Sequence, residues 1–132
     1  MKRTKRYNRG FTMIELMVVV AIIGMLAVIV APAVMNNLGR GQRTTAQAQM
    51  ANIATALDTY RLDMGSYPQT LDGLVENDSG RGTWAGPYIK EIPLDPWGNE
   101  YVYSAEGNTF SLMSYGADRA PGGEGDAADI RH

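Results

Sequence analysis

The chain has 132 residues, a net charge of -2 and no cysteine. This length allows one small domain with appendages, and the lack of cysteine excludes disulfides, thiolate metal sites and thiol nucleophiles. Five of the twelve basic residues lie in the first ten positions, namely Lys2, Arg3, Lys5, Arg6 and Arg9. The remainder carries seven basic against fourteen acidic residues, a net charge of -7, which argues against nucleic-acid binding.

A long apolar run follows the basic start. No residue between Leu16 and Leu38 is ionisable, and Val, Ile, Leu, Ala and Met dominate the run. It satisfies the requirement of roughly 20 residues for a transmembrane helix, and the preceding basic residues predict a cytoplasmic N-terminus. A secretory signal peptide is the alternative. Its apolar region would span only about 7–15 residues, and Ala31 and Ala33 form a weak cleavage site.

One carboxylate, Glu15, stands at the edge of this run. An unpaired charge at the bilayer centre costs about 2.5–3.5 kcal/mol on insertion scales, and less where the side chain reaches interfacial water. In a protein-packed interior of low dielectric constant, the same carboxylate needs a cation. Glu15 is therefore either an acid that reaches water at the interface or a group that a partner must neutralise.

The stretch RGFTMIELMVVVAIIGMLAVIVAP resembles the N-terminal signature of type IV pilins and type II secretion pseudopilins. In that family a prepilin peptidase cleaves after the glycine, here Gly10, and methylates the new N-terminal residue, here Phe11. The resemblance implies that residues 1–10 are a cleaved leader. It also makes Glu15 the family's glutamate, with the Phe11 amine of a neighbouring subunit as its natural partner.

Pro32 matches the helix-interrupting proline of this family. Because proline lacks a backbone donor, we expect a kink or local unwinding of the apolar helix there. We assign residues 11–40 to a transmembrane and assembly helix, and residues 41–132 to a globular domain.

Regular apolar spacing continues beyond the membrane run. Steps of three and four residues join Ala46, Met50, Ile53, Leu57, Tyr60 and Met64. This spacing predicts an amphipathic continuation of the same helix, which ends at Gly65. A free coiled coil is the alternative, although the repeat covers only about three heptads.

The remaining segments predict a small sheet. Thr70 is a candidate N-cap for a brief helix from Leu71, and EYVYSA and TFSLMSY are strand-like runs joined by residues 106–108. We expect these runs to form a hairpin that covers the apolar stripe of the helix. Trp84 and Trp97 are expected to pack against this core instead of lining a ligand site. The predicted fold class is α+β.

The segments SYP, DGL, YIKEIPLDPWGNEY and SYGAD…GG…DAADI resemble the major pseudopilins of type II secretion. The resemblance implies a pilin-like fold and a homopolymeric periplasmic filament that drives folded exoproteins through the outer-membrane secretin. Implied partners are minor pseudopilins, the prepilin peptidase/N-methyltransferase, a platform protein and an assembly ATPase. Membrane lipid surrounds the helix before assembly, with the subunit in the Gram-negative inner membrane and its C-terminal domain in the periplasm.

Two other classes of function are alternatives for this sequence. An adhesive or motility type IV pilin shares the assembly chemistry, but it more often carries a C-terminal cysteine pair that this chain lacks. An enzyme is not expected, because the single histidine is the terminal His132 and no Ser–Asp arrangement accompanies it.

The C-terminal segment SYGADRAPGGEGDAADI combines glycines with carboxylates at Asp118, Glu124, Asp126 and Asp129. Calcium takes 6–8 oxygen ligands, and glycines let backbone carbonyls turn inward, but no EF-hand spacing is present. On spacing alone a solvated acidic loop is the favoured interpretation of the segment. The family resemblance implies one structural Ca²⁺ held by Asp118 and Asp129, with carbonyls near Leu112 and Ser114. Asp126 is a further candidate, because Ala128 stands beside Asp129 where the family often has an acid.

Overall fold

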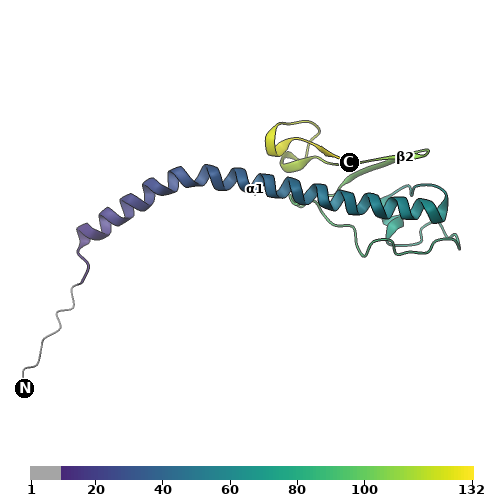
Figure 1. Ribbon diagram of the computed structural model, residues 1–132, viewed down its shortest axis with the longest axis horizontal. Coiled ribbons are helices and arrows are strands. Elements are labelled where there is room, and N and C mark those ends of the chain that lie inside the picture. The colour runs from purple at the N-terminus through teal and green to yellow at the C-terminus, as the bar shows by residue number, and fades with distance from the viewer. Residues whose placement is uncertain (1–9) are drawn as a thin grey trace, which may run out of the picture. The chain divides into compact units, whose positions relative to one another are not determined.

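The structure is a computed structural model that describes residues 10–132, so the basic residues of the expected leader lie outside the described part. Its elements are α1 (Met13–Met64), η1 (Leu71–Leu74), β1 (Val102–Glu106), β2 (Thr109–Ser114), η2 (Gly116–Asp118), η3 (Gly125–Ala127) and β3 (Ile130–Arg131) (Figure 1). The chain divides into two compact units, one ending at Asn37 and the other comprising Leu38–His132.

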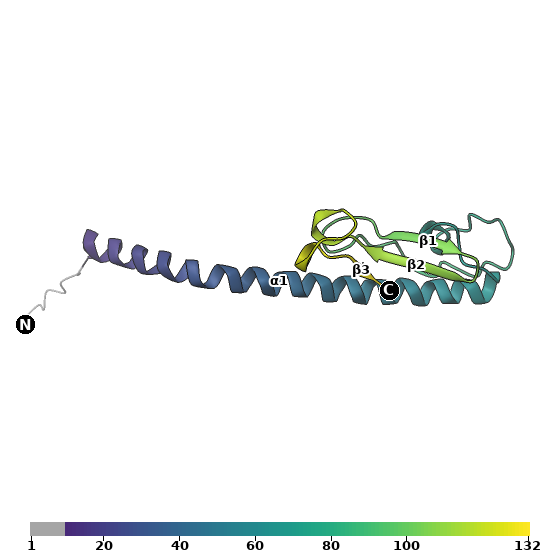
Figure 2. The same cartoon turned by 90° about the horizontal axis from the view of Figure 1, so that it is seen from above.

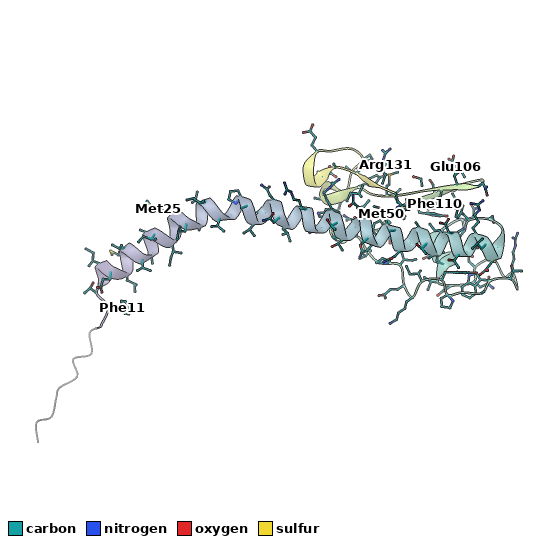
Figure 3. All side chains as sticks on the ribbon, in the orientation of Figure 1. Phe11, Met25, Met50, Glu106, Phe110 and Arg131 are labelled. Atoms are coloured by element: carbon teal, nitrogen blue, oxygen red, sulfur yellow. The ribbon has the colours of Figure 1, made fainter. Side chains whose placement is uncertain are left out.

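In the first unit, α1 exposes apolar side chains on every side. Met13 is 80% exposed, and Met25, which projects away from the helix in Figure 3, is 73% exposed. Among the described residues, α1 is the one helix with a stretch long and apolar enough to cross a bilayer. An all-round apolar surface of this kind is typical of a segment solvated by lipid.

Pro32 lies inside α1, and the helix is continuous on both sides of it. The helix is therefore not unwound at this residue, and the alternative expectation, a kink, stays a prediction. Proline removes one backbone donor, but the other hydrogen bonds of the surrounding turns remain and hold the helical path. A role for Pro32 in assembly stays a prediction.

In the second unit, α1 buries the apolar stripe predicted from its spacing. All six positions are less than 9% exposed: Ala46, Met50, Ile53, Leu57, Tyr60 and Met64. The helix ends at Met64 as expected, because Gly65 adopts a positive φ of 79° and donates its N–H to the Arg61 carbonyl at 2.8 Å. Glycine is the residue that adopts this left-handed conformation without steric penalty.

Three antiparallel strands lie alongside this half of α1 in the order β1-β2-β3 (Figure 2). The predicted hairpin is confirmed, with Tyr103 paired to Leu112 across its two strands. The third strand was not predicted. It pairs Ile130 with Ser114, and two residues are too few to produce a recognisable alternation.

The hydrophobic core lies between the helix stripe and the sheet. Leu57 of α1, Leu74 of η1 and Leu112 of β2 are each fully buried in it, and Met50 and Phe110 lie where helix and hairpin meet (Figure 3). Full burial of such a side chain is worth about 1.5–3 kcal/mol. The stripe is thus covered within the chain itself, which excludes the free coiled coil.

The structure also tests the predictions for the two tryptophans and for the start of η1. Trp84 and Trp97 pack partly buried against the core, as predicted. Thr70 occupies the N-cap position of η1, but its side chain makes no capping hydrogen bond. Thr70 therefore precedes η1 without capping it through its hydroxyl.

Candidate functional sites at the helix start and the acidic loop

The first turn of α1 is closed by a reciprocal pair of hydrogen bonds. The Thr12 N–H donates to Glu15 Oε2 at 2.9 Å, and the Glu15 N–H donates to Thr12 Oγ1 at 3.2 Å. This is a capping box, which satisfies two donors that a helix start leaves unpaired. The negative charge of Glu15 also interacts favourably with the positive, N-terminal end of the helix dipole. The sequence reasoning above missed this function of Glu15, although the Thr-x-x-Glu spacing is its signal.

The capping box leaves part of Glu15 accessible. Oε2 is held by Thr12, whereas Oε1 has no hydrogen-bond partner among residues 10–132, and the side chain is exposed. The carboxylate is therefore held at the helix start by one oxygen, while its other oxygen makes no hydrogen bond to the described residues. A cation supplied by another molecule can bind there without breaking the cap.

The Gly10–Phe11 bond precedes the helix. Neither residue belongs to a helix or strand, and both are exposed. A peptidase needs an accessible, non-helical substrate segment, and this bond meets that requirement. Because the cap uses the N–H of Thr12, cleavage before Phe11 leaves both capping hydrogen bonds possible.

The acidic loop, residues 115–129, is closed at its base by the pairing of Ser114 with Ile130. Both oxygens of Asp129 accept the Gly122 N–H at 3.0 Å, and Asp118 Oδ1 accepts the Ala120 N–H at 3.1 Å. Asp118 Oδ2 lies 3.0 Å from the position that a Cβ on Gly123 would occupy. The two carboxylates predicted as ligands thus converge on the adjacent residues Gly122 and Gly123.

Gly123 has no room for a side chain. Its φ is +91°, and a Cβ there would overlap the Ala127 carbonyl group. Only glycine combines this conformation with so close an approach of the backbone. The loop is therefore a compact, folded segment.

The oxygen donors of this loop are of the chemical type that calcium binds, but the described side chains alone are too few to fill its coordination shell. The Asp126 side chain lies outside the described part, and no group of three or more carboxylate or imidazole side chains that could hold a metal occurs among the rest. The Leu112 carbonyl accepts the His132 N–H at 3.0 Å, and Ser114 is fully buried. Two carboxylates and backbone oxygens are hard donors of the type calcium uses, and carbonyls or water would have to complete the shell.

Arg43 anchors the acidic loop to α1, a contact that the sequence reasoning missed. Its Nη1 donates to the Gly125 carbonyl at 3.0 Å and to the Ala128 carbonyl at 2.9 Å. The ion pair between Arg131 and Asp129, at 3.9 Å with Arg131 largely exposed, adds little by comparison. Arg43 therefore supplies both a fixed attachment and a positive charge beside the loop.

The N-terminal half of α1 is apolar on every side and begins with a capping box, and its second half buries an apolar stripe under a small antiparallel sheet. This combination defines the class of pilin-like filament subunits. Residues 33–132 match the family described as "Type II secretion system (T2SS), protein G". Residues 5–31 match the "Prokaryotic N-terminal methylation motif". The chain belongs to the type II secretion system protein G family.

Relatives and a solved structure agree with this assignment. The chain is 44% identical over 135 residues to type II secretion system core protein G of Pseudomonas aeruginosa, covering 96% of this chain and 95% of that protein. It is 41% identical to the protein of the same name from Vibrio cholerae, covering 95% and 91%. The crystal structure of the major pseudopilin from the type 2 secretion system of enterohaemorrhagic Escherichia coli aligns with a TM-score of 0.56 at 28% identity, covering 74% and 90%.

These findings confirm the expected family and the pilin-like α+β fold, a long N-terminal helix packed on a small antiparallel sheet. They also confirm the expected function as a pseudopilus subunit of type II secretion, and they do not favour the adhesive or motility pilin. The family is one of structural subunits, and one apolar N-terminal helix fits a single-pass inner-membrane protein.

Proposed function

We propose that this pseudopilus subunit is cleaved after Gly10, methylated on Phe11, and assembled through an ion pair between Glu15 and the Phe11 amine of a neighbouring subunit. The observation that carries the proposal is the geometry of Glu15, whose Oε2 is held by Thr12 while Oε1 has no partner among the described residues. Cleavage creates a new cation one residue before the cap. A charge that only the correct neighbour neutralises specifies register, because a misplaced subunit leaves it unpaired.

The proposed topology follows from charge. The basic residues before the apolar run keep the N-terminus in the cytoplasm, so residues beyond about 40 lie in the periplasm. The proposed partners are further copies of this chain, minor pseudopilins, the prepilin peptidase/N-methyltransferase, the platform protein and the assembly ATPase. The work of moving exoproteins to the secretin comes from these partners, so the chain itself has a structural function.

We also propose that the acidic loop holds one structural calcium ion. Asp118 and Asp129 would supply carboxylate oxygens, with carbonyls near Leu112 and Ser114 and with Asp126 as a further candidate. The convergence of Asp118 and Asp129 on Gly122 and Gly123 supports this assignment. When bound, the ion would offset the mutual repulsion of the carboxylates and stabilise the folded loop by linkage.

Deletion of the gene in its host tests the function as a whole. We expect loss of secretion of folded exoproteins, restored by the wild-type chain, and no long surface pili on wild-type cells by electron microscopy. Filaments should appear when the chain is overproduced together with its assembly ATPase. Normal secretion in the deletion strain, or a loss of adhesion with secretion intact, would contradict a pseudopilin and support an adhesive pilin.

A further inference from the structure

Asp95 is a buried carboxylate that lies outside both the helix start and the acidic loop. It is 4% exposed and begins the turn formed by residues 95–99. Its Oδ1 accepts the N–H of Trp97 at 3.1 Å and the N–H of Asn99 at 2.8 Å, and its own N–H donates to the Asn99 carbonyl at 2.8 Å. One carboxylate oxygen is thus sufficient to hold the turn together.

The second oxygen of Asp95 reaches a distant part of the chain. Ser114, the last residue of β2, donates its hydroxyl to Asp95 Oδ2 at 2.6 Å. The Ser114 Oγ in turn accepts the Gly116 N–H at 3.2 Å, and Asn99 Nδ2 donates to the Gly116 carbonyl at 3.5 Å. The turn therefore holds the chain at the point where it leaves the sheet and enters the acidic loop.

The position of Ser114 relates this contact to both predicted ligands. Gly116 is the first residue of η2, which ends at Asp118. Across the sheet Ser114 pairs with Ile130, which directly follows Asp129. A shift of Ser114 would thus move the start of the segment that carries Asp118 and the end of the segment that carries Asp129.

The arrangement also explains why an acid and not an amide stands at this position. The hydrogen bonds to Trp97 and Asn99 need an acceptor at Oδ1, which asparagine also has. The Ser114 hydroxyl is fully buried and needs an acceptor for its proton, which Asp95 Oδ2 supplies at 2.6 Å; an asparagine NH₂ group in that place could only donate and would leave this proton without its acceptor. Aspartate satisfies all of these donors at once.

We propose that Asp95 is the positioning residue of the acidic loop: by fixing Ser114 it sets the geometry of the carboxylates and carbonyls, and so the affinity of the loop for calcium. This inference rests on the calcium site proposed above. Asp95 acts through Ser114 and is not itself a proposed ligand, because it is 4% exposed and three donors, those of Trp97, Asn99 and Ser114, already surround its oxygens. The Asp129 oxygens, by contrast, accept from the single N–H of Gly122.

Calorimetric titration of the full chain in detergent micelles with CaCl₂ tests the proposal, together with melting curves in calcium and in EDTA. We expect Asp95→Asn and Ser114→Ala each to raise Kd for calcium at least tenfold and to shrink the rise in Tm that calcium produces. The double variant should have a Kd for calcium no higher than that of the single variant with the higher Kd, because both changes remove the same hydrogen bond between Asp95 and Ser114. Circular dichroism confirms that each variant is folded.

Asp58→Asn is the matched control, since Asp58 also accepts a hydrogen bond from a hydroxyl, that of Tyr67, at 2.9 Å, but lies on α1 away from the loop. It should change the stability without changing Kd. If Asp95→Asn lowers Tm equally with and without calcium and Ser114→Ala leaves Kd unchanged, Asp95 is only a structural residue of its turn and the inference is overturned. If the wild-type chain itself shows neither binding heat nor a rise in Tm, the calcium site and this inference are both wrong.

Discussion

Thr12 and Glu15 hold each other across the first turn of α1, each donating its backbone N–H to the side chain of the other. The acid proposed to recruit the neighbouring subunit is therefore also the acid that starts the helix. The two functions use different properties of the same side chain. Capping needs an acceptor oxygen, whereas pairing with an amine needs a negative charge.

Replacing Thr12 by alanine tests the cap alone. We expect the start of α1 to be destabilised by about 1 kcal/mol, because the Glu15 N–H loses its acceptor. The amide hydrogens of Glu15 and Leu16, which both bond to Thr12, should then exchange about fivefold faster in detergent micelles. Thr12→Ser keeps the hydroxyl and should exchange like the wild type. Equal protection in the alanine and serine variants would contradict a capping function.

Replacing Glu15 by glutamine separates the two functions. Glutamine can still accept the Thr12 N–H, so amide protection at the helix start should be retained. The charge is lost, so filaments should fail to form although the subunit inserts into the membrane. Glu15→Ala should lose both properties and still insert. Glu106→Gln, which removes an exposed charge at the end of β1, is the control for a change in net charge and should assemble.

Filament yield by electron microscopy and membrane insertion by fractionation measure these outcomes. Normal filaments from Glu15→Gln would show that the negative charge is dispensable and would overturn the proposed ion pair. Loss of insertion would instead place the effect of the substitution before assembly.

Chelation of calcium should lower the stability of the globular unit. An ion present at 100 times its Kd stabilises the folded state by about 2.7 kcal/mol, so EDTA should lower Tm of the full chain in micelles by several degrees. Asp118→Asn and Asp129→Asn should melt like the wild type in EDTA and should gain little from calcium. Glu124→Gln serves as a control in the same loop. A melting curve unaffected by EDTA would argue against a bound ion.

High pH should destabilise the globular unit through two tyrosines. Burial, and for Tyr101 also the nearby charge of Asp95, raises the pKa of Tyr101 and of Tyr103 to about 12. The folded state thus holds these protons more tightly than the unfolded chain, whose tyrosine pKa is about 10. The resulting stabilisation is complete below about pH 10 and is lost as the pH rises from about 10 through about 12.

Urea unfolding of the full chain in micelles, followed by the fluorescence of Trp84 and Trp97, measures this effect. Across that window each tyrosine lowers the free energy of unfolding by up to about 1.4 kcal/mol per pH unit. In Tyr101→Phe and Tyr103→Phe the fall should be shallower, because the titrating group is absent. The same pH dependence in the double variant as in the wild type would contradict the assignment.

Periodic features of this fold were predictable, and contacts between distant segments were not. The stripe from Ala46 to Met64 repeats over five turns of helix, so its burial could be read from spacing alone. The β1–β2 hairpin is likewise local, with strongly β-forming residues on both sides of a short turn. Strand β3, by contrast, forms by pairing its two residues with the edge of β2, and no local sequence pattern indicates this pairing.

The candidate sites divide in the same way. Gly10, Phe11 and Glu15 form a contiguous motif, and the structure adds the partnership with Thr12. In the acidic loop the carboxylates were visible in the sequence, but Arg43 and Asp95 were not. They lie 82 and 19 residues from the groups they bind, and side-chain hydrogen bonds over such distances depend on the tertiary fold.

The most direct test of the central claim is a structure of the purified filament by electron cryomicroscopy at side-chain resolution. The account predicts that each subunit begins at a methylated Phe11 and that its amine lies within about 4 Å of the Glu15 carboxylate of a neighbour. A filament whose subunits still begin at Met1, or in which Glu15 faces no positive charge, would contradict it.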